Sequence, residues 1–136
     1  MKKINIAVVG LGNIGSYFVK TVLKNRNNIA KKTGKIPVIK YISAKSLKKK
    51  RKIKIPKSKW VKNPISLTIK KDVDVIVELI GGSDGIAKKL IYHALKNKKH
   101  VITANKALMA KHGDLLALLA EKNKVNLEYE ASVAGG

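Results

Sequence analysis

The fold of this chain is decided by INIAVVGLGNIG, residues Ile4–Gly15. The apolar, mostly β-branched half of this stretch predicts a buried strand, and a helical pattern of apolar residues follows its glycines. Gly10 allows a tight turn, Gly12 lets the backbone approach a pyrophosphate closely, and Gly15 lets the helix pack close to its strand. The N–H groups at the start of that helix favour an anion. We therefore predict a dinucleotide-binding turn, with a purely structural turn as the alternative, formed by Gly10, Leu11, Gly12, Asn13, Ile14 and Gly15.

The composition is that of a globular protein of about one domain. The chain has 136 residues, 45% of them hydrophobic, which is enough to bury a real core. It contains no cysteine, which excludes a disulfide framework, a thiolate metal site and a thiol nucleophile. The lack of cysteine is compatible with the cytoplasm, where we expect the protein. No apolar run approaches the roughly 18 residues that span a bilayer, so we expect no membrane partner.

The net charge of +22 would normally suggest a nucleic-acid partner. All eight acidic residues lie at Asp72 or later, and only two of the 30 basic residues are arginine. Nucleic-acid readout favours arginine forks with interleaved aromatics, whereas aromatic residues make up only 4% of this chain. We therefore interpret the charge as a general lysine-rich surface, and a basic nucleic-acid-binding protein remains an alternative.

The rest of the sequence alternates strands with helical segments. We expect the segment 45–59 to be a basic surface loop, with Trp60 anchoring its end to the domain. The alternation predicts an α/β fold of Rossmann type over residues 1–136, a doubly wound, mostly parallel sheet with helices on both faces. Strands are expected at 3–9, 36–42, 73–80, 100–103 and 125–130, and helices at 13–23, from Pro64 to Leu67, at 86–95, from Lys106 to a break at His112-Gly113, and at 115–121 with Asp114 as cap.

The carboxyl ends of parallel strands meet at one edge of the sheet, where ligands of such folds bind. Gly10, Ser43, Gly81 and Thr103 are expected at that edge. The second strand there ends without the carboxylate that selects NAD. Lys45, with the hydroxyl groups of Ser43 and of residue 46, could instead hold the 2′-phosphate of NADP. We therefore favour NADP, with NAD possible, and the alternative is that Lys45 is one solvated lysine among many.

Three further groups of residues are candidates for chemistry, each with a plain structural alternative. Ile80-Gly81 could bring backbone against a nicotinamide, or form an ordinary turn. Lys106, just after Thr103, could carry a proton or anchor charge in a cleft, or begin a helix at the surface. Glu130 before the glycine-rich end could supply oxygens to a hard cation, or simply end a strand. The three histidines lack metal-ligand spacing.

Taken together, these segments resemble homoserine dehydrogenase. The matching stretches are IAVVGLGNIG, DVDVIVELIGGSDG, HVITANKALMAKHG and LEYEASVAGG, which span residues 6–136 around the basic segment. The glycine turn is shared with many dehydrogenases, whereas the other three in this order are much more specific. The resemblance implies an NAD(P)-dependent oxidoreductase that interconverts L-aspartate 4-semialdehyde and L-homoserine, on the branch that leads to threonine, methionine and isoleucine.

The resemblance also assigns roles to residues of this chain. It implies that Gly10 to Gly15 bind the cofactor pyrophosphate and that Lys106 is the catalytic lysine near nicotinamide and substrate. It implies hydride transfer between nicotinamide and aldehyde, with Lys106 stabilising the oxygen charge or passing the proton. It further implies a site for a monovalent cation such as sodium, formed by Glu130, Val133 and Gly135.

The family continues past Ala134-Gly135-Gly136 into a substrate and dimerisation region. The resemblance therefore implies that residues 1–136 are the NAD(P)-binding domain, with that second region absent. We expect the isolated chain to bind NADP(H) without turnover, and a homo-oligomer only for the complete enzyme. A stand-alone module that binds NADP(H) without chemistry is the alternative.

Overall fold

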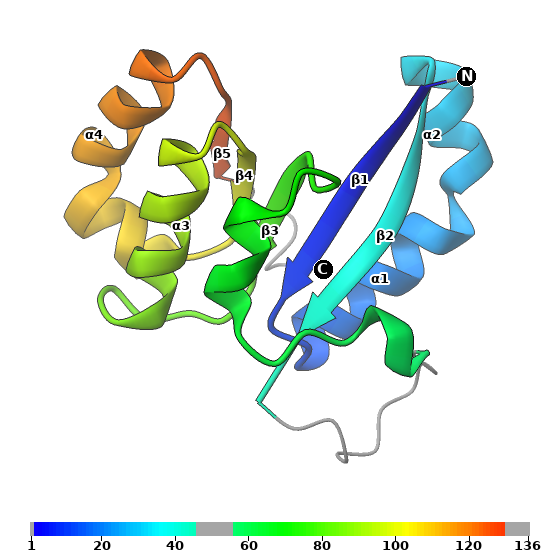
Figure 1. Cartoon of the computed structure of the whole chain (residues 1–136), viewed down its shortest axis with the longest axis horizontal. Helices are drawn as coiled ribbons and strands as arrows, with labels where there is room; N and C mark the ends of the chain where they lie inside the picture. The colour runs from blue at the N-terminus through cyan, green and yellow to red at the C-terminus, as the bar shows by residue number, and fades with distance from the viewer. Residues whose placement is uncertain (1, 46–55, 130–136) are drawn as a thin grey trace.

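The computed structural model describes residues 2–45 and 56–129. They form the predicted parallel sheet, and its strands follow the order β2-β1-β3-β4-β5 (Figure 1). The strands are β1 (Lys2–Val9), β2 (Lys35–Ser43), β3 (Val75–Glu78), β4 (His100–Thr103) and β5 (Leu127–Tyr129). The helices are α1 (Asn13–Lys24), α2 (Arg26–Thr33), α3 (Ile86–Lys96) and α4 (Lys106–Lys122), with short 3-10 helices η1 (Lys57–Lys59) and η2 (Pro64–Ile69).

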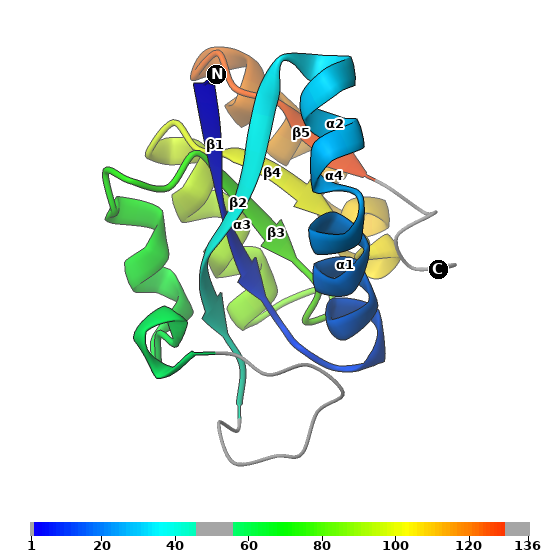
Figure 2. The ribbon, with the colours of Figure 1, turned by 90° about the vertical axis from the view of Figure 1, so that its right-hand side faces the viewer.

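Helices cover both faces of the sheet because its central strands are apolar on both sides. In β1, Ala7 and Val9 belong to a core with α3, α4 and η2, while Ile6 and Val8 belong to a second core with α1. Successive side chains of a strand point to opposite faces, so one apolar run serves both layers. Figure 2 shows α1 and α2 on one side of the sheet and α3 on the other.

The order in which the chain adds strands to the sheet reverses at β1. From β1 it runs through α1 and α2 to β2 on one side, then returns through η2 to β3 on the other. Where the connections after two adjacent strands run in opposite directions, a crevice opens at the carboxyl ends of those strands. Ligands of this kind of sheet bind in that crevice. The topology therefore places a candidate site at the ends of β1, β2 and β3.

The helix break predicted at His112-Gly113 is wrong. Helix α4 is continuous over 17 residues, and Asp114 lies inside it instead of capping a second helix. Leu108 and Leu116 lie on either side of the glycine and are both buried in the same core. Their packing offsets the roughly 1 kcal/mol that a glycine costs in a helix interior.

Helix α2 was not predicted, and two strands are shorter than expected. Ala30 is the one buried residue of α2, so the segment has almost no apolar periodicity. Strand β3 covers only part of the predicted 73–80 segment, and β5 part of 125–130. The anchor expected at Trp60 is present, since it pairs with Ile42 at the end of β2 and packs against the second core. Most of the predicted basic loop lies outside the described residues.

Candidate functional site

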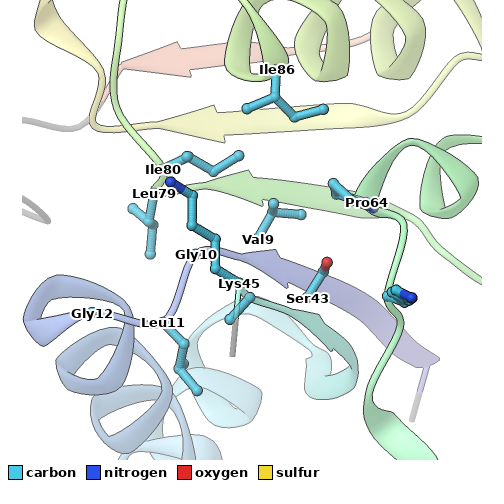
Figure 3. Close-up of a pocket in the computed structure, with 12 residues that line it drawn as sticks. Val9, Gly10, Leu11, Gly12, Ser43, Lys45, Pro64, Leu79, Ile80 and Ile86 are labelled. Atoms are coloured by element: carbon cyan, nitrogen blue, oxygen red, sulfur yellow. The ribbon is translucent and has the colours of Figure 1, made fainter. Parts of the chain in front are cut away.

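A pocket of about 500 Å³ lies at the carboxyl ends of β1, β2 and β3 (Figure 3). Six of the predicted site residues line it: Gly10, Leu11, Gly12, Ser43, Lys45 and Ile80. The rest of its lining was not predicted and consists of Val9, Ala44, Lys62, Pro64, Leu79 and Ile86. No lining residue carries a carboxylate, whereas two are lysines.

Two glycines of the first turn are required by the fold itself. Gly10 has a φ of 99°, and a Cβ on it would lie 2.7 Å from the carbonyl oxygen of Leu79. A Cβ on Gly15 would overlap the carbonyl oxygen of Gly10. The Gly10 N–H also donates to the carbonyl oxygen of Ser43 at 2.8 Å. These contacts hold the turn against the ends of β2 and β3 through backbone alone.

Gly12 is different, because the described structure has no need of a glycine there. Its φ is −78°, which any residue adopts, and a Cβ on it would meet no other atom within 4 Å. It is the N-cap residue of α1 and has no side chain with which to cap the helix. A helix leaves its first N–H groups without intrahelical partners, and here they lie beside the pocket. The space at Gly12 therefore fits an anionic group such as a pyrophosphate.

Two lysines enter the pocket from different segments. Lys45 follows the end of β2, and Figure 3 draws its side chain in the direction of Leu79 and Ile80. Lys62 lies between Trp60 and η2, so no local sequence pattern linked it to Lys45. Ser43 lines the pocket although only 2% of its surface is exposed. A second phosphate would find positive charge on this wall and no competing carboxylate.

Glu78 is fully buried at the end of β3. Its Oε2 atom accepts hydrogen bonds from the backbone N–H groups of Ile80 at 2.7 Å and Gly81 at 3.0 Å. Its Oε1 atom accepts from the hydroxyl of Thr103 at 2.7 Å. Burying a carboxylate is costly unless donors surround it, and three donors do so here. Glu78 thus joins the ends of β3 and β4 below the pocket.

Asn105 extends this network to α4. Its side-chain oxygen accepts from the Leu108 N–H at 3.0 Å and caps the helix, while its Nδ2 donates to the Gly82 carbonyl at 2.6 Å. The Thr103 hydroxyl oxygen accepts from the Asn105 N–H at 3.0 Å. The sequence predicted a helix from Lys106, immediately after Asn105. The N-cap preference of asparagine is the local signal for its capping role.

None of the other predicted residues that the structure describes is part of the pocket lining. Thr103 is buried in the network just described, and Gly81 begins the loop after Ile80 with a φ of 91°. Lys106 is the first residue of α4 and is exposed. The remaining three, all in the first turn of α1, are Asn13, Ile14 and Gly15. Glu130, Val133 and Gly135, together with the residue 46 hydroxyl, fall outside the described residues.

The described residues hold no group of three or more histidine, aspartate or glutamate side chains that could bind a metal ion. His112 contacts Asp84, and the Nδ1 of His100 accepts from the Asn126 N–H at 3.1 Å. Both histidines therefore have protein partners in the described structure. In the part of the chain that the structure describes, no helix is long and apolar enough to cross a membrane.

Comparison with known proteins agrees with this geometry. The model of the family described as homoserine dehydrogenase, NAD binding domain, matches residues 10–130. The homoserine dehydrogenases of Neisseria gonorrhoeae and Bacillus subtilis are 42% and 39% identical over 136 residues, which is all of this chain and 31% of each of those proteins. A crystal structure of the S. aureus homoserine dehydrogenase at pH 7.5 matches with a TM-score of 0.88 and 44% identity, over 96% of this chain and 34% of that one. The chain spans about a third of the length of these relatives.

Proposed function

The chain belongs to the homoserine dehydrogenase family, and on that premise we propose that its pocket binds NADP(H) as the cofactor domain of such an enzyme. The observation that carries the proposal is the open space at Gly12, at the uncapped start of α1. A fold that needed glycine only for packing would require Gly10 and Gly15 and would tolerate another residue at Gly12. Room kept at that one position supports a bound phosphate.

The lining residues suggest how the cofactor would be held. The backbone from Gly10 to Gly15 would bind the pyrophosphate, with the first N–H groups of α1 facing it. Lys45, Lys62 and Ser43 would hold the adenosine 2′-phosphate, since an ammonium group binds phosphate as a point charge. NADP is preferred over NAD in this proposal because the described lining offers no carboxylate to a free ribose hydroxyl. Leu79, Ile80 and Gly81 would lie beside the nicotinamide half.

In the whole enzyme the proposed reaction interconverts L-aspartate 4-semialdehyde and L-homoserine, with consequences for threonine, methionine and isoleucine synthesis. The nicotinamide supplies the hydride chemistry when bound. Lys106 would stabilise the developing oxygen charge or pass the proton, because it is an exposed ammonium group at the end of the Thr103 strand. The chain spans about a third of its relatives' length, and we propose that these 136 residues alone bind NADP(H) without turnover.

Three further parts of the proposal rest on the family resemblance. A monovalent cation such as sodium would be held by Glu130 with the backbone of Val133 and Gly135. The complete enzyme would be a homo-oligomer, and its compartment the cytoplasm, with which a chain free of cysteine is compatible. Cation binding can be tested by titrating the chain with sodium while following the backbone amide resonance of Tyr129, the neighbour of Glu130 in the sequence, by NMR.

The test of cofactor choice is a titration of the chain with NADPH and with NADH. We expect the affinity for NADPH to exceed that for NADH by about tenfold or more, because the 2′-phosphate gains two ammonium partners. Lys45→Asp should remove most of that preference, because it weakens the binding of NADPH. The affinity for NADH should change less than about threefold. Lys35→Asp makes the same charge change at the exposed opposite end of β2 and should leave both affinities unchanged.

Two results would contradict the proposal. An unchanged preference in Lys45→Asp would remove the role given to Lys45. Tight, steeply salt-dependent binding of a DNA duplex without any binding of NADPH would instead favour a basic nucleic-acid-binding protein. The DNA titration is therefore run at two salt concentrations beside the two nucleotides.

A further inference from the structure

The loop from Gly81 to Gly85 joins two walls of the pocket. Ile80 lines the pocket just before this loop and Ile86 lines it just after. Gly81, Gly82 and Gly85 have φ values of 91°, 86° and 75°, a backbone conformation that other residues rarely adopt. The shape of the loop therefore sets where the Ile80 and Ile86 walls lie relative to one another.

This loop is held at its inner end by buried polar groups. Glu78 accepts the Gly81 N–H, and Asn105 donates to the Gly82 carbonyl. Both side chains are almost fully buried, with exposed fractions of 0% and 6%. The first half of the loop is thus fixed to the ends of β3 and β4.

The outer end is held differently, by the exposed carboxylate of Asp84 in the loop, which contacts two side chains of helix α4. Asp84 lies 2.6 Å from the Lys111 Nζ and 2.9 Å from the His112 Nε2. The Ser83 hydroxyl donates to the same Asp84 carboxylate at 3.2 Å. The Lys111 ammonium, and after it His112, holds the pKa of Asp84 well below its usual range, so the carboxylate stays charged throughout the neutral range.

These contacts have little to do with the overall stability of the fold. The side chains of Asp84 and Lys111 are 52% and 57% exposed, and ion pairs of this kind contribute little to unfolding free energy. Their geometric effect is larger, since they tie the flexible glycine loop to a 17-residue helix that packs against the main core. Such a contact can select one shape of a loop whose glycine backbone permits several.

We propose that Asp84 is a positioning residue, which latches the Gly81–Gly85 loop onto Lys111 and His112 of α4 and so keeps the wall that receives the nicotinamide half of the cofactor in its binding shape. The inference rests on the proposed function, because it assigns that half of the pocket to nicotinamide. The adenosine half is lined by Ser43, Lys45 and Lys62, none of which the latch touches. Loss of the latch therefore affects one half of the cofactor only.

The test compares NADPH with 2′-phospho-ADP-ribose, which lacks the nicotinamide. If Asp84→Ala reduces the binding-competent loop to about a tenth of the population, NADPH binds about tenfold more weakly. Binding of 2′-phospho-ADP-ribose should stay within about twofold, and the fluorescence of bound NADPH should shift toward that of free NADPH. Lys111→Ala should act in the same direction, and the double variant should be no weaker than Asp84→Ala, because both residues belong to one contact.

The matched control is Asp114→Ala, which removes an exposed aspartate from helix α4, the helix that Asp84 contacts. It should leave the affinity for both ligands unchanged. Equal weakening of NADPH and 2′-phospho-ADP-ribose by Asp84→Ala, or an equal effect of Asp114→Ala, would overturn the latch alone. A wild-type chain that binds neither ligand would overturn the proposed function and the latch with it.

Discussion

The two glycine-rich turns of this chain are built on different principles. In the first, residues 10–15, Gly10 and Gly15 allow backbone atoms to approach closely, and the Gly10 N–H bonds to the carbonyl oxygen of Ser43. In the second, residues 81–85, three glycines allow positive φ values, and side chains of Glu78, Asn105 and Asp84 hold the loop. The first is fixed by packing and the second by polar contacts.

The helix starts differ in their capping, and α3, which follows the second turn, begins after Gly85 without a side-chain cap, as α1 does after Gly12. Helix α1 begins at Gly12 without a side-chain cap, so its N–H groups are available to an anion. Helix α4 begins at Asn105, whose side chain occupies the corresponding position. We infer that the first turn is a preformed phosphate site, whereas the second is a loop whose shape depends on the side chains around it.

The largest expected effect comes from filling a packing glycine of the first turn. Gly15→Ala should destabilise the chain by about 3 kcal/mol, because its Cβ would overlap the backbone of Gly10 and force α1 away from β1. Gly113→Ala is the matched control, since the nearest atom to its Cβ would be the Met109 Cε at 3.5 Å. That variant should stabilise α4 by about 0.5–1 kcal/mol.

Urea unfolding followed by circular dichroism measures both variants. Opposite signs for the same chemical change would support a first turn fixed by backbone contact. If Gly15→Ala were as stable as the wild type, the turn would not be held by packing, and the contrast with the second turn would disappear.

A smaller effect is expected from the buried carboxylate of the second turn. Glu78→Ala removes the acceptor of the Ile80 and Gly81 N–H groups and should cost about 2 kcal/mol. Glu78→Gln keeps an oxygen acceptor and should cost less, about 1 kcal/mol. The exposed Glu128 on β5 gives the control, and Glu128→Ala should change stability by less than about 0.5 kcal/mol.

Hydrogen exchange distinguishes the location of the change. Glu78→Ala should speed the exchange of the Ile80 and Gly81 amides more than that of amides in β1. Unaltered protection of those two amides would show that Glu78 does not hold the loop.

The sequence predicted the first turn better than the second for a physical reason. GxGxxG after an apolar strand is a local sequence motif, so it was sufficient to indicate the turn and the α/β fold, although Gly10 itself packs against Leu79 and bonds to Ser43 far along the chain. The second turn also depends on contacts between residues 23 to 28 positions apart, such as Asn105 with Gly82 and His112 with Asp84. No local pattern predicts such contacts.

The errors have the same origin. The break predicted at Gly113 used the intrinsic cost of glycine in a helix, whereas burial of Leu108 and Leu116 decided the outcome. Lys62 was missed because it approaches Lys45 only after the chain has crossed a long connection. Lys106 was assigned by family resemblance, and its role stays a prediction since it does not line the described pocket.

Our main proposal is that Gly12 leaves room for a bound ligand, and that the fold itself does not require a glycine there. It is tested most directly by measuring NADPH affinity and melting temperature together in Gly12→Asp. We expect the melting temperature of Gly12→Asp to lie within about 2 °C of that of the wild type, because the new side chain meets open space. We expect NADPH binding to be weakened about 100-fold or more, because a carboxylate would face the pyrophosphate. A Gly12→Asp chain that binds NADPH like the wild type would contradict the claim.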